Sequence, residues 1–123
     1  MNGRRVLVAA DDPASVDLLT YFLESRGFSV STAPDGNQAV ELGTSGEFEV
    51  VILDVHMPMY DGIEILDILR KRHVLHPVKV IALTGDLSEP VREALEGARV
   101  DAYMTKPVDL ALLGAEVERL MVA

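Results

Sequence analysis

The stretch Val50-Val51-Ile52-Leu53-Asp54 places four consecutive apolar residues directly before an acid. An unbroken apolar run of this length, without alternating polar residues, is typical of a β-strand that is buried on both faces. Strands buried on both faces belong to parallel sheets whose two sides are covered by helices. The acid at position 54 would then stand at the carboxyl end of such a strand.

Apolar runs and amphipathic segments alternate along the rest of the chain. Strands are predicted at 6–10, 28–33, 50–53, 78–83 and 100–104. Apolar residues at helical spacing predict helices at 13–26, 37–42, 65–69, 91–98 and 110–121. Asp12 is the expected N-cap of the first helix and Gly27 its stop, and Ser88 is the expected cap of the fourth. A strand followed by a helix, repeated five times, predicts an α/β fold with one parallel sheet between two helical layers.

Composition and charge exclude several classes of protein. The chain has 123 residues, and its 20 acids against 11 bases give a formal charge of −9. A negative field repels nucleic-acid phosphates and anionic lipids, so neither direct nucleic-acid binding nor membrane binding is expected. The absence of cysteine excludes disulfides and thiol catalysis. The apolar run at 6–10 is too short for a signal peptide or a membrane span. We therefore expect one cytoplasmic domain over residues 1–123, with no output domain.

Polar residues follow the predicted strands at their carboxyl ends, where open parallel sheets bind ligands. These residues are Asp11 and Asp12 after the first strand, Asp54 after the third, Thr84 after the fourth and Lys106 after the fifth. Clustered carboxylates repel one another, and Mg²⁺, which prefers oxygen ligands, would relieve that repulsion. Together with a lysine and a hydroxyl, the cation would form a cradle for a phosphoryl group. Asp54 has the position of a carboxylate nucleophile in that cradle.

A known family carries the same pattern. The stretch 54–62, DVHMPMYDG, resembles the D-x-x-M-P-x-x-D-G segment of response-regulator receiver domains, the aspartate-phosphorylated switches of two-component signalling. Thr84 lies 30 residues after Asp54, and Lys106 lies 22 residues after Thr84, as in that family. Lys106 and Pro107 resemble the family's K-P pair, usually joined by a cis peptide. The resemblance runs from position 5 to about 121.

The resemblance implies a flavodoxin-like, doubly wound, five-stranded sheet with strand order 2-1-3-4-5. It implies that Asp54 accepts a phosphoryl group and that Lys106 and Thr84 hold it. It also implies that Mg²⁺ binds Asp11, Asp54 and the backbone carbonyl of His56, and that Tyr103 is the switch aromatic paired with Thr84. The implied donor is a sensor histidine kinase or a phosphotransfer protein, and the implied target is an output protein or domain. A homodimer through the fourth helix, fifth strand and fifth helix is a further implication.

One position departs from the family. Receiver domains usually carry two adjacent acids at the end of the first strand, and here the first of them falls on Ala10 and the second on Asp11. We expect Asp12 to cap the following helix instead of binding the cation. The missing carboxylate is expected to weaken Mg²⁺ binding and to leave the fold unchanged.

Two other functions are compatible with the same fold. The domain could be a binding module that is never phosphorylated, with Ala10 as the sign of that loss, and phosphorylation assays separate the two. It could also be a phosphatase with an aspartate nucleophile in a D-x-D motif, but position 56 is His and not Asp. We therefore expect no enzyme beyond self-catalysed phosphoryl acceptance and slow autodephosphorylation.

Overall fold

The structure, a computed structural model, describes residues 4–56, 62–71, 78–85 and 87–121. Strands and helices alternate strictly along the chain. The elements are β1 (Arg5–Ala9), α1 (Pro13–Ser25), β2 (Ser29–Ala33), α2 (Gly36–Gly43), β3 (Val50–Asp54), α3 (Gly62–Lys71), β4 (Lys79–Thr84), α4 (Glu89–Gly97), β5 (Ala102–Thr105) and α5 (Leu110–Met121). All five strands are parallel and lie in the order β2-β1-β3-β4-β5, so the predicted doubly wound topology is confirmed.

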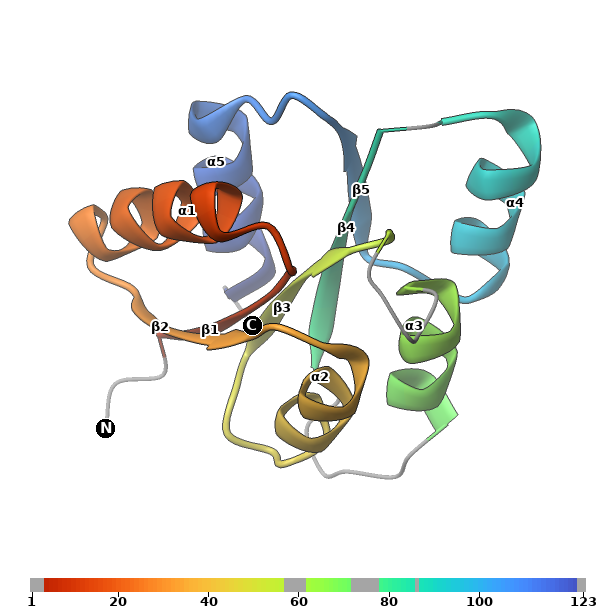
Figure 1. Ribbon diagram of the computed structural model, residues 1–123, viewed down its shortest axis with the longest axis horizontal. Helices are drawn as coiled ribbons and strands as arrows, with labels where there is room; N and C mark the ends of the chain where they lie inside the picture. The colour runs from red at the N-terminus through yellow and green to blue at the C-terminus, as the bar shows by residue number, and fades with distance from the viewer. Residues whose placement is uncertain (1–3, 57–61, 72–77, 86, 122–123) are drawn as a thin grey trace.

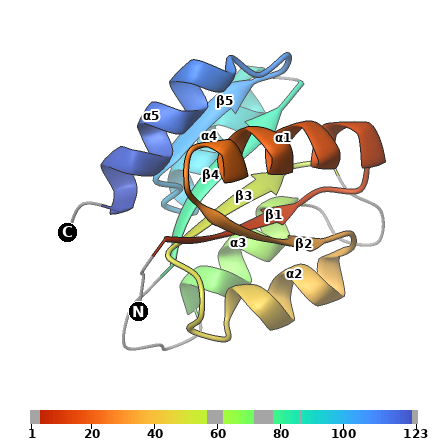
Figure 2. The same cartoon turned by 90° about the vertical axis from the view of Figure 1, so that its left-hand side faces the viewer.

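Helices cover both faces of this sheet. The views in Figures 1 and 2 show α1 and α5 on one side, with α2, α3 and α4 on the other. Each side has its own apolar cluster, one built around Leu23 and Leu113 and the other around Leu66 and Leu95. Every residue of β3 is buried because β3 is the central strand, which explains the unbroken apolar run at 50–53. In the described part of the chain no helix is long and apolar enough to cross a membrane.

The expected strand bounds differ most at β5, which begins at Ala102 and not at position 100. A turn accounts for the delay, because Arg99 adopts a positive φ of 62°. The backbone N–H of Val100 then bonds back to the carbonyl of Leu95, and that of Asp101 to the carbonyl of Val80. Val100 therefore closes the turn, and Asp101 makes a backbone bond to β4 just before β5 begins.

Both ends of α1 follow the sequence prediction. The Asp12 carboxylate accepts the backbone N–H of Ser15 at 3.3 Å and its hydroxyl at 2.6 Å, and Pro13 begins the helix. Gly27 follows the helix with a φ of 92°, a conformation that glycine adopts without steric cost. Asp12 is thus confirmed as a helix cap.

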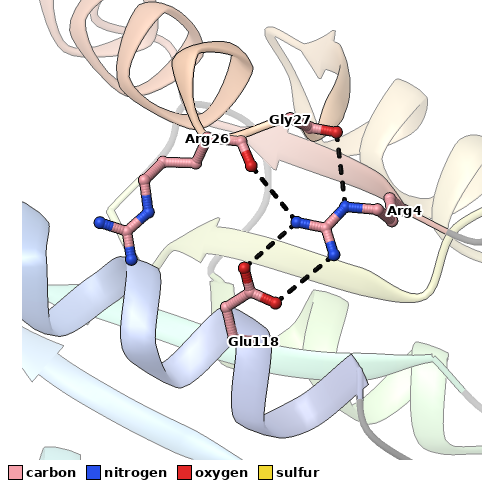
Figure 3. Close-up of polar contacts among 4 residues, drawn as sticks. All are labelled: Arg4, Arg26, Gly27 and Glu118. Carbon is pink, nitrogen blue, oxygen red and sulfur yellow. Dashed lines mark hydrogen bonds and ion pairs between the residues drawn. The ribbon is translucent and has the colours of Figure 1, made fainter.

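Figure 3 shows that Arg4, just before β1, contacts both the end of α1 and a side chain of α5. The Arg4 guanidinium donates to the Glu118 carboxylate of α5 at 3.1 Å and to the carbonyls of Arg26 and Gly27 at 3.3 and 3.4 Å. It also lies 4.3 Å from the ring centroid of Phe28. Arg4 precedes β1, so these contacts lie at the amino ends of the strands. The polar residues singled out by the sequence lie at the other end of the sheet, where the strands finish.

Candidate functional site

Asp54 is the buried acid at the carboxyl end of β3. Only 5% of it is exposed, and both carboxylate oxygens have partners. Oδ1 accepts the backbone N–H of His56 at 3.0 Å, and Oδ2 accepts the Lys106 ammonium at 2.9 Å. A buried carboxylate needs such a partner because an unpaired charge in the interior is costly. The structure therefore brings together the two residues that the sequence placed 52 positions apart.

The loop after β5 brings Lys106 to this position. Its backbone N–H bonds to the carbonyl of Thr84 at 2.9 Å, and the Lys106–Pro107 peptide is cis, as the sequence suggested. The side chain then reaches past the end of β4 to Asp54, which lies on the next strand. The ammonium is thus held at the sheet edge while 39% of the side chain remains exposed.

Thr84 and Tyr103 lie on neighbouring strands. Thr84 is the last residue of β4, fully buried and paired in register with Thr105. Tyr103 is paired with Ala82, two residues before Thr84. Its ring is half-buried and its hydroxyl donates to the Glu96 carboxylate at 2.9 Å. This bond to a carboxylate raises the pKa of the Tyr103 phenol because it favours the protonated form.

The two acids after β1 differ in their environment. Asp11 is exposed, with no hydrogen bond among the contacts of the described residues. Asp12 is also exposed, but the Ser15 hydroxyl and the first amides of α1 lower its pKa, with a smaller contribution from the charge of Lys106. The Asp12 carboxylate is therefore engaged by the helix end, whereas Asp11 presents its oxygens to solvent.

Ala10 lines a pocket beside the Asp54–Lys106 pair. Its methyl group is buried and packs within the α1–α5 layer. The pocket has a volume of about 230 Å³, and its lining residues are Ala10, Ser15, Leu18, Leu19, Asp54, Leu83, Lys106, Pro107, Val108 and Leu110. Apart from Ser15, Asp54 and Lys106 these residues are apolar. The departure at position 10 therefore adds a methyl group to the mostly apolar lining of this pocket.

The oxygen donors at this edge fit a magnesium ion. The residues named by the sequence offer two carboxylates, Asp11 and Asp54, and the carbonyl of exposed His56. Mg²⁺ takes oxygen ligands, keeps several waters and needs few protein carboxylates. Within the described ranges no group of three or more carboxylate or imidazole side chains could hold a metal ion.

Gly62 fixes the start of α3 directly against the site. Its N–H bonds to the carbonyl of Val55 at 2.9 Å. A Cβ at this position would lie 2.5 Å from Val55 Cα and 3.0 Å from the Asp54 carbonyl. Only glycine permits this close approach of two backbones. The motif residues 57–61 lie outside the described residues.

Gly62→Ala is expected to destabilise the fold by about 1–3 kcal/mol, because the new methyl group must displace backbone and not a movable side chain. The control is Gly114→Ala, whose Cβ would meet the side chains of Arg26 and Phe22 at 3.0 and 3.2 Å. The Arg26 side chain is long and can move away, so Gly114→Ala should lower the free energy of unfolding less than Gly62→Ala does. Urea unfolding of both variants measures the difference, and equal losses would contradict the backbone explanation.

Two pairings were not anticipated from the sequence, one at Tyr103 and one at the opposite end of the sheet, where β4 begins. Glu96 accepts the Tyr103 hydroxyl, and Asp101 accepts the Arg70 guanidinium. Neither pair belongs to a motif. Only the first had a local signal, since Glu89, Arg92 and Glu96 have the i, i+3 and i+4 spacing of ion pairs on a helix.

The comparisons with known proteins agree with this geometry. The sequence profile of the response regulator receiver domain matches residues 6–118. The transcriptional regulatory protein TcrA of Mycobacterium tuberculosis is 35% identical over 120 residues, which are 98% of this chain and 47% of that protein. The alkaline phosphatase synthesis transcriptional regulatory protein PhoP of Bacillus subtilis is 32% identical over 119 residues, covering 97% of this chain and 49% of PhoP. The chain thus spans about half the length of these curated relatives.

Solved structures show the same fold. The receiver domain of sensor histidine kinase PA1611 from Pseudomonas aeruginosa PAO1, crystallised with magnesium coordinated in its active site cleft, superposes with a TM-score of 0.89 at 26% identity, over 99% of this chain and 100% of that one. The receiver domain of Ssk1 from Saccharomyces cerevisiae, solved with the histidine phosphotransfer protein Ypd1, gives 0.85 at 26% identity, over 94% and 87% of the two chains. Since sequence profile, relatives and fold agree over almost the whole length, this chain belongs to the receiver domains of response regulators.

Proposed function

We propose that Asp54 accepts a phosphoryl group and that the resulting change of charge switches a protein-binding surface of this domain. The observation that carries the proposal is the contact between the Lys106 ammonium and the buried Asp54 carboxylate at the carboxyl edge of the sheet, 2.9 Å apart. A carboxylate is a nucleophile that forms acyl phosphates, and an adjacent cation stabilises the charge that develops on the transferred group.

The transfer itself exchanges one bond for another. A carboxylate oxygen of Asp54 forms a bond to phosphorus as the bond from phosphorus to the donor atom breaks. With a phosphohistidine donor, the leaving imidazole nitrogen takes a proton from solvent. The Lys106 ammonium would then contact the phosphoryl oxygens, and the hydroxyl of buried Thr84, on the adjoining strand, would donate one hydrogen bond to them.

The cation that we infer for this step is Mg²⁺, held by Asp11, Asp54 and the His56 carbonyl. When bound, it neutralises part of the negative charge of the phosphoryl group. The protein's own contribution is to point oxygen donors at one place and to keep Asp12 engaged elsewhere, at the helix end. The magnesium in the cleft of the PA1611 receiver domain supports this inference.

Partners follow from the same proposal. The donor would be a sensor histidine kinase or a phosphotransfer protein, a choice supported by the complex of the Ssk1 receiver domain with Ypd1. The output would be a separate protein or a domain, as in the transcriptional regulators of about twice this length. A homodimer through α4, β5 and α5, a cytoplasmic location and the lack of turnover beyond autodephosphorylation complete the proposal. The alternative of a module that is never phosphorylated is not favoured, because the matched profile is that of response regulator receiver domains and the curated relatives are transcriptional regulatory proteins.

Incubation with acetyl phosphate and Mg²⁺ is expected to add one phosphoryl group to the intact protein. The adduct should be labile to alkali, since it is an acyl phosphate, and Asp54→Asn should abolish it. Intact-mass spectrometry before and after alkali treatment measures both properties. The matched control is Asp67→Asn, a change of the same type at a half-exposed side chain of α3, which should leave the adduct unchanged. Persistence of the adduct in Asp54→Asn would refute the assignment.

The departure at position 10 predicts how magnesium affinity responds to mutation. Ala10→Asp is expected to tighten Mg²⁺ binding, because a nearby charge contributes about one to a few kcal/mol at intermediate dielectric, a figure reduced by the waters that Mg²⁺ retains. It should also destabilise the metal-free fold, since Ala10 is buried. Isothermal titration calorimetry measures the Mg²⁺ affinity of the wild type, Ala10→Asp and Asp12→Ala. Loss of binding in Asp12→Ala without a gain in Ala10→Asp would identify Asp12 as the ligand.

A further inference from the structure

A continuous series of polar contacts runs from Tyr103 along the surface of α4. The Tyr103 hydroxyl donates to Glu96 Oε2 at 2.9 Å, and the same oxygen lies 3.5 Å from the Arg92 guanidinium. Arg92 also pairs with Glu89, one turn earlier in the helix. Three residues of one helix are therefore connected to one side chain of the edge strand β5.

This attachment holds the Tyr103 hydroxyl at Glu96 of α4, a position that we call outward. Both residues project from the same face of the sheet, because Tyr103 is in register with Ala82 and Thr84 is two residues further along the same strand. Tyr103 packs at the margin of the cluster on that face, and its hydroxyl lies in solvent beside Glu96. Its neighbour in register on β4, Ala82, has only a methyl side chain. An inward rotation of the ring, towards Ala82 and Thr84, would have to break the bond to Glu96.

We propose that Glu96 is a positioning residue that retains Tyr103 in the outward position when the domain is not phosphorylated, and so sets the threshold of the switch. Its carboxylate reaches Tyr103 from α4, and Arg92 keeps that carboxylate oriented. The consequence of this role for phosphorylation rests on the proposed function of Asp54. The preference for the outward position itself does not.

The hydrogen bond between Tyr103 and Glu96 is of moderate strength, so it would favour the outward position without preventing the inward one. Half of the Glu96 side chain and 39% of the Arg92 side chain are exposed, so water competes for both groups. A hydrogen bond from a phenol to a carboxylate is nonetheless stronger than one between neutral groups. Losing it is expected to raise the ratio of inward to outward conformers about threefold to tenfold. The same bond to Glu96 raises the pKa of the Tyr103 phenol.

The first experiment uses unphosphorylated protein and no phosphoryl donor. Nuclear Overhauser contacts between the Tyr103 ring and the Thr84 methyl group report the inward position, and labelling the chain's three tyrosines simplifies their assignment. Glu96→Ala is expected to strengthen these contacts and to lower the pKa of Tyr103 towards its ordinary value. The matched control is Glu93→Ala, which removes the same charge from the exposed side of the same helix. Equal spectra for the wild type and Glu96→Ala would overturn the proposal.

The second experiment separates the hydroxyl from other effects of Glu96. In a Tyr103→Phe background no hydroxyl remains, so adding Glu96→Ala should not change the ring contacts further. A change as large as in the tyrosine background would show that Glu96 acts by another route and would overturn the proposal.

The third experiment adds acetyl phosphate and Mg²⁺. Because phosphorylation and loss of Glu96 favour the same conformer, the ratio of phosphorylated to unphosphorylated protein at subsaturating acetyl phosphate should be about threefold to tenfold higher in Glu96→Ala than in wild type. If no variant is phosphorylated, the function assigned to Asp54 fails while the first two arms still decide the role of Glu96.

Discussion

Lys106→Ala is expected to slow phosphoryl acceptance by Asp54 about a hundredfold, the usual cost of removing one group that stabilises transition-state charge. The ammonium is the cation seen in contact with the Asp54 carboxylate, and it would follow the phosphoryl oxygens once they replace that contact. Without Lys106, the inferred Mg²⁺ would be the cation left to balance the negative charge of the phosphoryl group during transfer. The variant should remain folded, because the side chain is partly exposed and His56 still donates its N–H to Asp54.

The rate is measured from intact mass during incubation with acetyl phosphate and saturating Mg²⁺. Lys71→Ala is the control, since Lys71 is an exposed lysine paired with Asp67 within α3. It should react at the wild-type rate. Thr84→Ala belongs in the same series and should accept the phosphoryl group but lose the accompanying change around Tyr103. A wild-type rate in Lys106→Ala would leave the proposed role of this lysine without support.

Asp101→Ala is expected to cost about 2–4 kcal/mol of stability, because it leaves a mostly buried guanidinium without its anion. The side chains of Arg70 and Asp101 are 12% and 23% exposed. Asp101 Oδ2 accepts both the Arg70 guanidinium and the backbone N–H of Val80, the latter at 2.7 Å. Arg70 further donates to the carbonyls of Val78 and Arg99 at 2.7 and 3.0 Å. One carboxylate thus stabilises the end of α3, the start of β4 and the turn before β5.

Urea unfolding measures this loss against Asp67→Ala, which breaks an exposed ion pair of the kind that contributes about 0–1 kcal/mol. The double variant Arg70→Met with Asp101→Ala should recover part of the stability, because no charge remains buried. A loss in Asp101→Ala as small as in Asp67→Ala would show that water already satisfies the Arg70 guanidinium.

The amino-acid sequence alone predicted a parallel sheet between two helical layers, whereas the strand order and the acceptor role of Asp54 were implied by the resemblance to receiver domains. The prediction of the layers depends on short-range patterns: the unbroken apolar run before Asp54, the helical spacing of apolar residues, and the cap and stop at Asp12 and Gly27. Helices and strands have fixed periods, so a single chain segment carries enough information to place its own buried face. The separations of Thr84 and Lys106 from Asp54 then identified the family.

Only the tertiary structure decided which side chains meet across those elements. It showed that the Ala10 methyl group leaves an apolar pocket beside Lys106, and that Tyr103 is bonded to Glu96. It also joined Arg70 to Asp101, 31 positions away. Such contacts depend on the angles at which helices pack on the sheet and on the rotamers chosen there, and no local period in the sequence encodes either. The sequence therefore predicted where the chemistry lies, whereas packing decided which side chains contact those residues.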